Sequence, residues 1–267
     1  MHVPAKLNVE RLQNGLRTRR FGKKIIFLRG TRSTNDLAKK LAGYGVDEGT
    51  VVIAETQKAG RGRLGRRWFS PMGGLWFSVV LRPKLRVSEA LRLVFVAGLA
   101  VAETLHELYG LSVETKWPND VLLNKRKICG ILSEMNTSGG KVNSAIVGIG
   151  VNVNFDVRES LPKELWQAVT SLENELHRRV RLEDLFKSLL ENLEKEYDLL
   201  INGDYIRVLD DWKRYASFLG HEVEVTSDSE SVCGSAIDVD FEGALIIKLK
   251  CGSTKRVIVG DVSLTTK

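Results

Sequence analysis

The fold is decided by Lys58-Ala59-Gly60-Arg61-Gly62-Arg63-Leu64-Gly65-Arg66-Arg67, ten residues with five positive charges, three glycines and no acid. Its glycines satisfy the G-x-G-x-x-G pattern, but a dinucleotide-binding site requires those glycines to open a helix. They are followed instead by a Pro/Gly turn and by residues 75–81, an aromatic and β-branched run that predicts a strand. Residues 50–54, just before the glycines, predict another strand. The glycine-rich stretch is therefore a loop between two strands, and the dinucleotide-binding fold is excluded.

The composition of this glycine-rich loop, residues 58–67, indicates an anion-binding role. Glycine lets backbone amides approach a ligand closely, and arginine presents a planar, permanently charged fork that suits carboxylate or phosphate oxygens. Because the loop has little apolar surface to bury, we expect it to be mobile and to become ordered around an anion. A solvated surface loop without a ligand is the alternative interpretation of the same residues.

Hydrophobic periodicity and turn signals predict the remaining elements. Ser33-Thr34-Asn35-Asp36 matches a capping box and predicts the start of a helix, whereas Gly110 predicts the end of another. Pro118-Asn119-Asp120 favours a type I turn between two strands. We expect helices at residues 9–16, 88–109, 182–201 and 204–218, and strands at 24–28, 113–117, 121–124, 127–135 and 143–154. Short strands at 222–226, 235–239, 244–249 and 255–259 predict a small all-β barrel of about 50 residues.

The composition is that of a soluble globular protein, since 43% of the 267 residues are hydrophobic and 27% are charged. No apolar run reaches the roughly 18 residues of a membrane span, and the N-terminus is too polar for a signal peptide. Cys129, Cys233 and Cys251 are scattered, and the four histidines are isolated. These patterns indicate neither a metal site nor a Ser/His catalytic pair, and they favour a reducing, cytoplasmic location.

The positive charge is concentrated in the first part of the chain. The net charge is +7, and residues 219–267 hold five basic and eight acidic side chains, which gives −3 there and +10 in residues 1–218. Residues 1–35 carry nine basic side chains and one acid, Glu10. Nucleic acid, a phosphate-bearing ligand or an acidic protein partner would each suit such a surface, and charge alone does not decide among them.

Five motifs, the glycine-rich loop among them, follow one another along the chain. The loop is preceded by Ser33-Thr34-Asn35 and followed by Lys116-Trp117-Pro118-Asn119-Asp120, Lys127-Ile128-Cys129-Gly130-Ile131-Leu132-Ser133-Glu134 and Gly148-Ile149-Gly150-Val151-Asn152. This combination closely resembles the biotin protein ligases. The resemblance implies an α+β catalytic domain at residues 1–218, with a mixed β-sheet flanked by helices as in class II synthetases and a short basic extension at 1–22. It also implies an SH3-like β-barrel at residues 219–267.

By the same resemblance, the chain joins biotin to ATP with the help of Mg²⁺. It then transfers biotin from the bound biotinyl-adenylate to one lysine of a biotin carboxyl carrier domain. Biotin is expected to contact Ser33, Thr34, Asn35, Gln57, Gly60, Arg61, Gly62, Arg63, Lys116 and Gly130. The nucleotide is expected to contact Arg63, Trp68, Lys116, Asn119 and Asn152, and catalysis to depend on Lys116, Arg61 and Arg63. No metal ligand from the protein is expected. The expected assembly is a homodimer, with no specific nucleic acid and no membrane as partner.

The residue types suit this chemistry. Adenylation brings a carboxylate against a phosphate, and two such anions repel by about 4 kcal/mol at about 4 Å if the effective dielectric constant is about 20. Lys116 is the expected bridge between the biotin carboxylate and the α-phosphate, with Arg61 and Arg63 closing over the adenylate. An unpaired ureido group would cost roughly 1–3 kcal/mol, so residues 33–35 and Gln57 are expected to pair with the ureido ring.

Three other functions stay open at this point. Some members of the family carry an N-terminal winged helix-turn-helix and act as repressors. Residues 1–22 hold room for one short helix, so their basic charge alone supports DNA binding. A lipoate ligase of related fold is the nearest enzymatic alternative, although the glycine-rich loop and residues 116–120 favour biotin. An inactive biotin-binding module is the third, and the intact charged loop argues against it.

Overall fold

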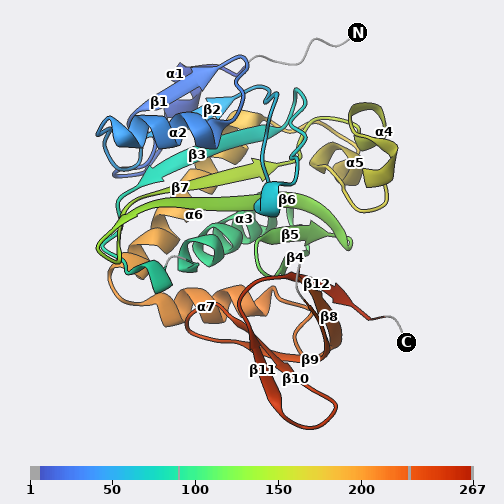
Figure 1. The fold of residues 1–267 in the computed structure, drawn as a ribbon. Coiled ribbons are helices and arrows are strands. Elements are labelled where there is room, and N and C mark those ends of the chain that lie inside the picture. Colours follow the sequence, from blue (N-terminus) through green and yellow to red (C-terminus); the bar gives the residue numbers. More distant parts are fainter. Residues whose placement is uncertain (1–6, 90, 228–229, 266–267) are drawn as a thin grey trace.

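Seven strands form the larger β-sheet of the computed structural model, which describes residues 7–89, 91–227 and 230–265 (Figure 1). They are β1 (Ile25–Leu28), β2 (Val51–Ala54), β3 (Leu75–Leu81), β4 (Val113–Lys116), β5 (Asp120–Leu123), β6 (Arg126–Ser138) and β7 (Lys141–Val151). Their spatial order is β1-β2-β3-β7-β6-β5-β4. The sheet is mixed, because β1 and β2 are parallel while every other neighbouring pair is antiparallel.

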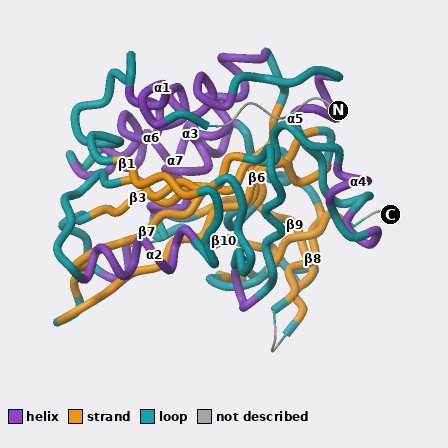
Figure 2. Tube along the Cα trace, turned by 90° about the horizontal axis from the view of Figure 1, so that it is seen from above, coloured by secondary structure: helices purple, strands orange, loops and turns teal. Residues whose placement is uncertain are grey.

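Helices cover both faces of this sheet (Figure 2). On one face lie α3 (Arg92–Tyr109), α6 (Leu182–Ile201) and α7 (Tyr205–Arg214), with the short α1 (Val9–Gln13) packed on α6. Most of α3 is buried, and Gly110 ends it with a left-handed φ of 66°. On the opposite face, α2 (Thr34–Gly43) packs Ala38 and Ala42 against Val52, Val80 and Ile146. In the part of the chain that the structure describes, no helix combines the length and the apolar character needed to cross a membrane.

The second sheet is antiparallel and has the order β11-β10-β9-β8-β12. Its strands are β8 (Glu222–Thr226), β9 (Ser231–Val239), β10 (Leu245–Lys248), β11 (Thr254–Val257) and β12 (Asp261–Leu264). The expected strand at 222–226 agrees with β8 to the residue. The pattern did not predict β12, because Val262 is its one buried residue and gives too weak a signal.

The turn between β9 and β10 packs against residues of the larger sheet and of α3. Trp117, which is 2% exposed, donates from its indole Nε1 to the carbonyl oxygen of Gly243 at 2.9 Å. Gly243 has φ 86°, and a Cβ there would come within 2.7 Å of the Phe95 ring on α3. The buried guanidinium of Arg92 lies 4.1 Å from the ring centroid of Phe241. The small sheet is therefore held next to β4 and α3.

The structure differs from the expected elements at a few places. After β7 it has α4 (Val157–Ser160), the 3₁₀ turn η3 (Lys163–Leu165) and α5 (Leu172–Leu176), which are too short to show a helical period. Helix α3 begins later than expected, after the 3₁₀ turn η2 (Val87–Glu89), and α7 ends earlier. The peptide bond between Trp117 and Pro118 is cis, whereas the type I turn expected at residues 118–120 was assigned without a cis bond. Residue 90 of the expected helix and residues 1–6 of the N-terminal extension lie outside the described residues.

The basic segment before β1 is packed on α6. The carboxylate of Glu194, on α6, accepts the backbone N–H groups of Arg19 at 2.5 Å, Arg20 at 2.7 Å and Phe21 at 3.0 Å. Asp198, one turn further along α6, forms ion pairs with both arginines. The positive charge of residues 19 and 20 is therefore matched by acids of the same chain.

Candidate active site

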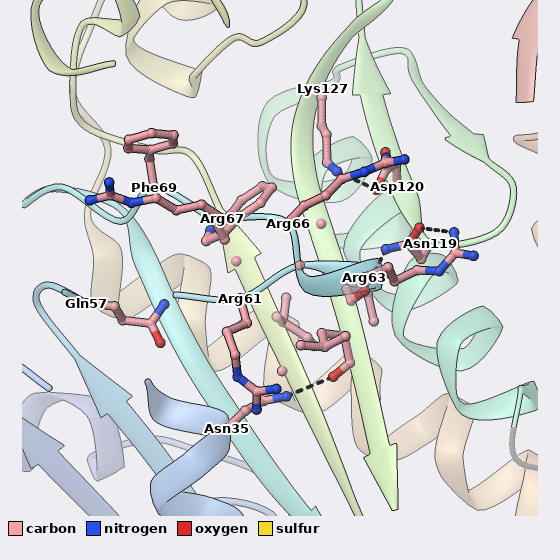
Figure 3. Close-up of a pocket in the computed structure, with 18 of the residues that line it drawn as sticks. Asn35, Gln57, Arg61, Arg63, Arg66, Arg67, Phe69, Asn119, Asp120 and Lys127 are labelled. Carbon is pink, nitrogen blue, oxygen red and sulfur yellow. Dashed lines mark hydrogen bonds and ion pairs between the residues drawn. The ribbon is translucent and has the colours of Figure 1, made fainter. Parts of the chain in front are cut away.

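A pocket of about 190 Å³ lies on the α2 face of the larger sheet (Figure 3). Strands β6 and β7 form its floor, and the start of α2 forms one end. The glycine-rich loop covers it, and the segment between β7 and α5 adds an apolar wall of Leu161, Leu165 and Val169. Asp261 of β12 reaches its rim from the small sheet. Elements from distant parts of the chain therefore meet around one cavity.

Neutral polar side chains gather at the α2 end of the pocket. Gln57 Oε1 accepts the backbone N–H of Thr34 at 2.8 Å and its hydroxyl at 3.1 Å, while Gln57 Nε2 donates to Ser70 Oγ at 2.8 Å. Ser33 caps α2, since its Oγ accepts the N–H of Asp36 at 3.3 Å. The hydroxyl proton of Ser33 has no acceptor among the described residues. This end therefore keeps one uncommitted hydroxyl donor.

Glycines on β6 and β7 leave room for an aromatic ring on the floor of the pocket. Gly130 and Gly150 are cross-strand partners. A Cβ would lie 2.8 Å from the Trp68 ring at position 130 and 2.7 Å from Trp68 Nε1 at position 150. The indole of Trp68 therefore rests directly on the backbone of the two strands.

The glycine-rich loop is folded into a small hairpin. Arg61 and Arg67 form an isolated β-bridge, and the N–H of Gly62 donates to the carbonyl of Arg66 at 2.7 Å. Its turn is the 3₁₀ element η1 (Arg63–Gly65). In this conformation the arginines of the loop pair with carboxylates of the protein, and the expected ordering of the loop around an anion stays a prediction.

Two arginines of the loop reach the small sheet. Asp261 forms ion pairs with Arg66 at 2.5 Å and with Arg63 at 3.5 Å. Arg63 Nη1 also donates to Asn119 Oδ1 and to the carbonyl of Gly260, both at 3.3 Å. Burial lowers the pKa of the Arg63 guanidinium, and the negative charge of Asp261 opposes that shift. Arg63 therefore links the loop, the turn after β4 and β12 at the rim of the pocket.

Lys127 stands at the other end of the pocket from Asn35 (Figure 3). Its ammonium forms an ion pair with Asp120 Oδ1 at 2.7 Å and lies 5.1 Å from the ring centroid of Trp68. Asn152 is 2% exposed and donates from Nδ2 to the carbonyls of Thr170 at 2.9 Å and Lys127 at 3.4 Å. Asn152 therefore holds the backbone of Lys127 in place next to the segment that forms the apolar wall.

Lys116, the lysine expected to bridge the two reactants, does not line the pocket. It ends β4 and is the cross-strand partner of Asp120, which pairs in turn with Gly130. Cross-strand partners point to the same face of a sheet, so Lys116 lies on the pocket face, two strands or about 10 Å from Gly130. The lysine that lines the pocket is Lys127, and the bridging role expected of Lys116 stays a prediction.

Most of the other expected residues come together. Those that line the pocket are Ser33, Thr34, Asn35, Gln57, Arg61, Gly62, Arg63, Trp68, Asn119, Gly130 and Asn152. Gly60 does not line it; a Cβ there would come within 2.9 Å of Ser70 Oγ, so this glycine lets the hairpin pack closely. Sequence reasoning gave no role to Lys127, Asp120, Arg66, Arg67, Phe69, Leu161, Leu165, Val169 or Asp261. Lys127 could have been found from the sequence, because it is the first residue of the motif at residues 127–134.

Both parts of the chain match known proteins. Residues 27–152 match the biotin/lipoate A/B protein ligase family, and residues 218–265 match the biotin protein ligase C-terminal domain. The bifunctional ligase/repressor BirA of Bacillus subtilis is 34% identical over 98% of this chain and 80% of that protein. The biotin–[acetyl-CoA-carboxylase] ligase of Paracoccus denitrificans is 34% identical over 83% of this chain and 93% of that protein. The solved biotin protein ligase from Aquifex aeolicus in complex with biotin and ATP has a TM-score of 0.77 and 30% identity, and the match covers 92% of this chain and 100% of that one.

The mixed sheet and the sequence of residues 27–152 are those of the biotin and lipoate ligase class. Within that class, the chain belongs to the biotin protein ligase family. The family resemblance and the α+β fold with a small C-terminal β-domain are therefore confirmed.

Proposed function

We propose that the pocket binds biotin at its neutral polar end and ATP at its cationic end, and that the chain ligates biotin to a carrier protein through a biotinyl-adenylate. One observation carries the proposal: a single cavity has uncharged donors and acceptors around Ser33 and Gln57 at one end and the cations Lys127, Arg63 and Arg66 toward the other. Biotin has the same polarity, with an uncharged ureido ring at one end and a carboxylate at the other. Bound in this direction, its carboxylate faces the cations.

The α2 end supplies the hydrogen bonds that a ureido ring needs. Ser33 has a free hydroxyl proton that can be donated to the ureido carbonyl. Thr34 donates its hydroxyl proton to Gln57 Oε1 and accepts from Ser78 Oγ, so its Oγ1 keeps one lone pair for a ureido N–H. Gln57 is fixed by Thr34 and Ser70 and keeps the second N–H of its amide as a donor. Such preorganised partners avoid the cost of roughly 1–3 kcal/mol for each unpaired buried polar group.

Lys127 is the residue that we assign to the reacting groups. Its ammonium is held over the pocket floor by Asp120 and Trp68, where the biotin carboxylate and the α-phosphate would meet. One cation between the two anions offsets a repulsion of about 4 kcal/mol at about 4 Å, for an effective dielectric constant of about 20. It also stabilises the charge that develops on the phosphate as the carboxylate oxygen attacks and pyrophosphate leaves.

The apolar wall suits the adenine base. Leu161, Leu165 and Val169 line the pocket beside Trp68 and Phe69, which together make a slot with aromatic and aliphatic sides. A planar base gains from stacking on an aromatic ring and from leaving water. These residues belong to the segment after β7 that sequence periodicity did not predict.

Magnesium fits this site as a partner of the phosphates. In the described ranges no group of three or more His, Cys, Asp or Glu side chains could hold a metal ion. Mg²⁺ commonly binds through one or two carboxylates together with substrate phosphates, and Asp120 is the carboxylate on the pocket wall beside Lys127. The ion would supply charge neutralisation of the triphosphate during adenylation.

The second step needs an acceptor lysine held in line with the activated acyl carbon. No covalent attachment of biotin to this chain is required, because the amine attacks the mixed anhydride directly and AMP leaves. The +10 charge of residues 1–218 would favour encounter with an acidic carrier domain. A homodimer, a cytoplasmic location and a domain boundary at 218/219 stay predictions.

Biotin-dependent exchange of labelled pyrophosphate into ATP tests the first step, and label transfer from biotin to a purified biotin carboxyl carrier domain tests the second. The proposal expects both with biotin and neither without ATP. Lipoate is the matched competitor: exchange that lipoate supports better than biotin would move the chain to the lipoate branch of the class.

A further inference from the structure

Arg61 of the glycine-rich loop is paired with two carboxylates that lie on different elements. Its Nη2 lies 2.5 Å from Asp36 Oδ1 on α2, and 2.8 Å and 3.0 Å from the two carboxylate oxygens of Glu134 on β6. Burial lowers the pKa of Arg61, but the hydrogen bonds and negative charge of Glu134 and Asp36 outweigh it, and the pKa is raised overall. This arginine therefore stays charged and is held at the α2 end, away from Lys127 (Figure 3).

Glu134 also holds a side chain of the polar end. The Nδ2 of Asn35 donates to Glu134 Oε2 at 2.9 Å and to the carbonyl of Leu132 at 3.2 Å. A carboxylate accepts hydrogen bonds and donates none, so only the NH₂ side of the Asn35 amide can face Glu134. The other side, Oδ1, then accepts the hydroxyl of Ser78 at 2.6 Å. Glu134 thus determines which way round the Asn35 amide sits.

The sheet leaves this amide no room to move. A Cβ at position 148 on β7 would overlap the Asn35 amide, so Gly148 lets Asn35 lie against the strand. Gly130, Leu132 and Glu134 alternate along β6 and share the pocket face, which puts Glu134 on the same side as the floor. One carboxylate therefore touches both the loop that covers the pocket and the amide that lines its polar end.

We propose that Glu134 is a positioning residue for biotin, which couples the closed conformation of the glycine-rich loop, through Arg61, to the orientation of Asn35. The inference rests on the proposed function, because it concerns the polar end of the same pocket. It changes the role expected of Arg61: this guanidinium supports the loop on the biotin side, while Arg63 and Arg66 lie toward Asp261 and the nucleotide side.

The test compares Glu134→Gln, Arg61→Gln and the double variant with the wild type in biotin-dependent pyrophosphate exchange. Each single variant is expected to raise the KM for biotin on the order of 5–10-fold, the scale of losing a charged hydrogen bond. The KM for ATP should stay within about twofold, which corresponds to less than about 0.5 kcal/mol, because Arg61 and Glu134 lie at the α2 end of the pocket. The double variant should be no worse than the more impaired single variant, because both remove one interaction.

Glu114→Gln is the matched control. The side chain of Glu114 on β4 is 21% exposed against 20% for Glu134 and has its own cation, Lys125, at 2.7 Å. Its partners are Lys125 and Ser217, and neither of them lines the pocket. This variant should keep the wild-type KM for biotin. Arg61 is exposed on its loop, so Arg61→Gln is expected to fold. Its KM for biotin would still test the inference if Glu134→Gln failed to fold.

Three results would overturn the inference. A rise in the KM for ATP with an unchanged KM for biotin in Arg61→Gln would make Arg61 a nucleotide ligand. Additive effects in the double variant would separate Arg61 from Glu134. A wild-type protein with no biotin-dependent exchange would instead reject the proposed function, whereas an active wild type with unchanged variants would reject this inference alone.

Discussion

Gly130 on β6 and Gly150 on β7 face each other across the sheet, and the indole of Trp68 lies over both. The ring could not lie there if either position carried a methyl group, since a Cβ would come within 2.8 Å of it. Glycine at these two positions therefore allows the side chain of Trp68, which follows the glycine-rich loop, to lie on the floor of the pocket.

Replacing Gly150 by alanine should displace Trp68 and weaken nucleotide binding. Overpacking of this kind costs about 1–3 kcal/mol, which corresponds to a rise of about 5-fold or more in the KM for ATP. Tryptophan fluorescence during ATP titration and exchange kinetics measure the effect. Gly43→Ala on α2 is the control, because a Cβ there meets nothing within 4 Å. Unchanged ATP binding in Gly150→Ala would show that Trp68 can move without consequence.

The regular elements of the fold could be predicted because their buried residues follow one period. The helix expected at 182–201 and the strand expected at 222–226 agree with α6 and β8 to the residue. The segments that were missed, such as α4 and β12, have one buried residue each, so no period exists to detect. Their positions depend on tertiary packing instead, as with the Phe155 and Leu161 cluster around Trp76.

The motifs of the sequence predicted many residues of the site, but not the residues that lie outside those motifs. Motif order brought Ser33, Gln57 and Asn119 into one expected site, and the pocket contains them. It did not show that Lys127, near the start of β6, lines the pocket, whereas Lys116, at the end of β4, does not. The difference lies in how β4, β5 and β6 pair and where the pocket falls on them, which the motifs do not contain. Asp261 was missed because it comes from the far end of the chain and reaches the pocket through tertiary packing.

Lys127→Gln should lower biotin adenylation by at least about 10²-fold, the scale of losing one charge-stabilising group at the transition state. Lys116→Gln is the comparison, a lysine on the same sheet face outside the pocket, and should cost less than about tenfold. Pyrophosphate exchange at saturating biotin and ATP measures both. A larger loss in Lys116→Gln than in Lys127→Gln would favour Lys116 as the bridging lysine.

Asp261→Asn should loosen the cover of the pocket on the nucleotide side. The variant removes the carboxylate that Arg63 and Arg66 share and leaves the Arg61 side of the loop untouched. Faster escape of the biotinyl-adenylate is expected, by about tenfold for a loss of about 1.4 kcal/mol. Release of labelled adenylate after gel filtration measures the rate. A wild-type rate would mean that Asp261 does not hold the closed loop.

Asp240, in the turn between β9 and β10, should make stability depend on pH. Burial raises its pKa, but the hydrogen bond from Arg256 and those from the N–H groups of Ala244 and Glu242 lower it below the ordinary 3.8. Because the folded pKa lies below the unfolded one, the stabilisation is complete above about pH 4 and disappears as pH falls through the folded pKa.

Asp240→Asn should therefore lower the free energy of unfolding by about 1 kcal/mol at neutral pH. The difference from wild type should shrink below about pH 4. Urea unfolding between about pH 3 and 7 measures it. Asp210→Asn, at an exposed residue of α7, serves as the control. A difference that grows on acidification would contradict the sign of this argument.

The central claim is that Lys127, with Arg63 and Arg66 of the loop, lets two anions meet and then retains the mixed anhydride. The most direct measurement is a single turnover with labelled biotin and ATP, in which the protein-bound product is isolated and then mixed with a carrier domain. The account predicts bound biotinyl-adenylate in the wild type, almost none in Lys127→Gln, and transfer of the label to the carrier lysine without further ATP. Bound adenylate at the wild-type level in Lys127→Gln would contradict it.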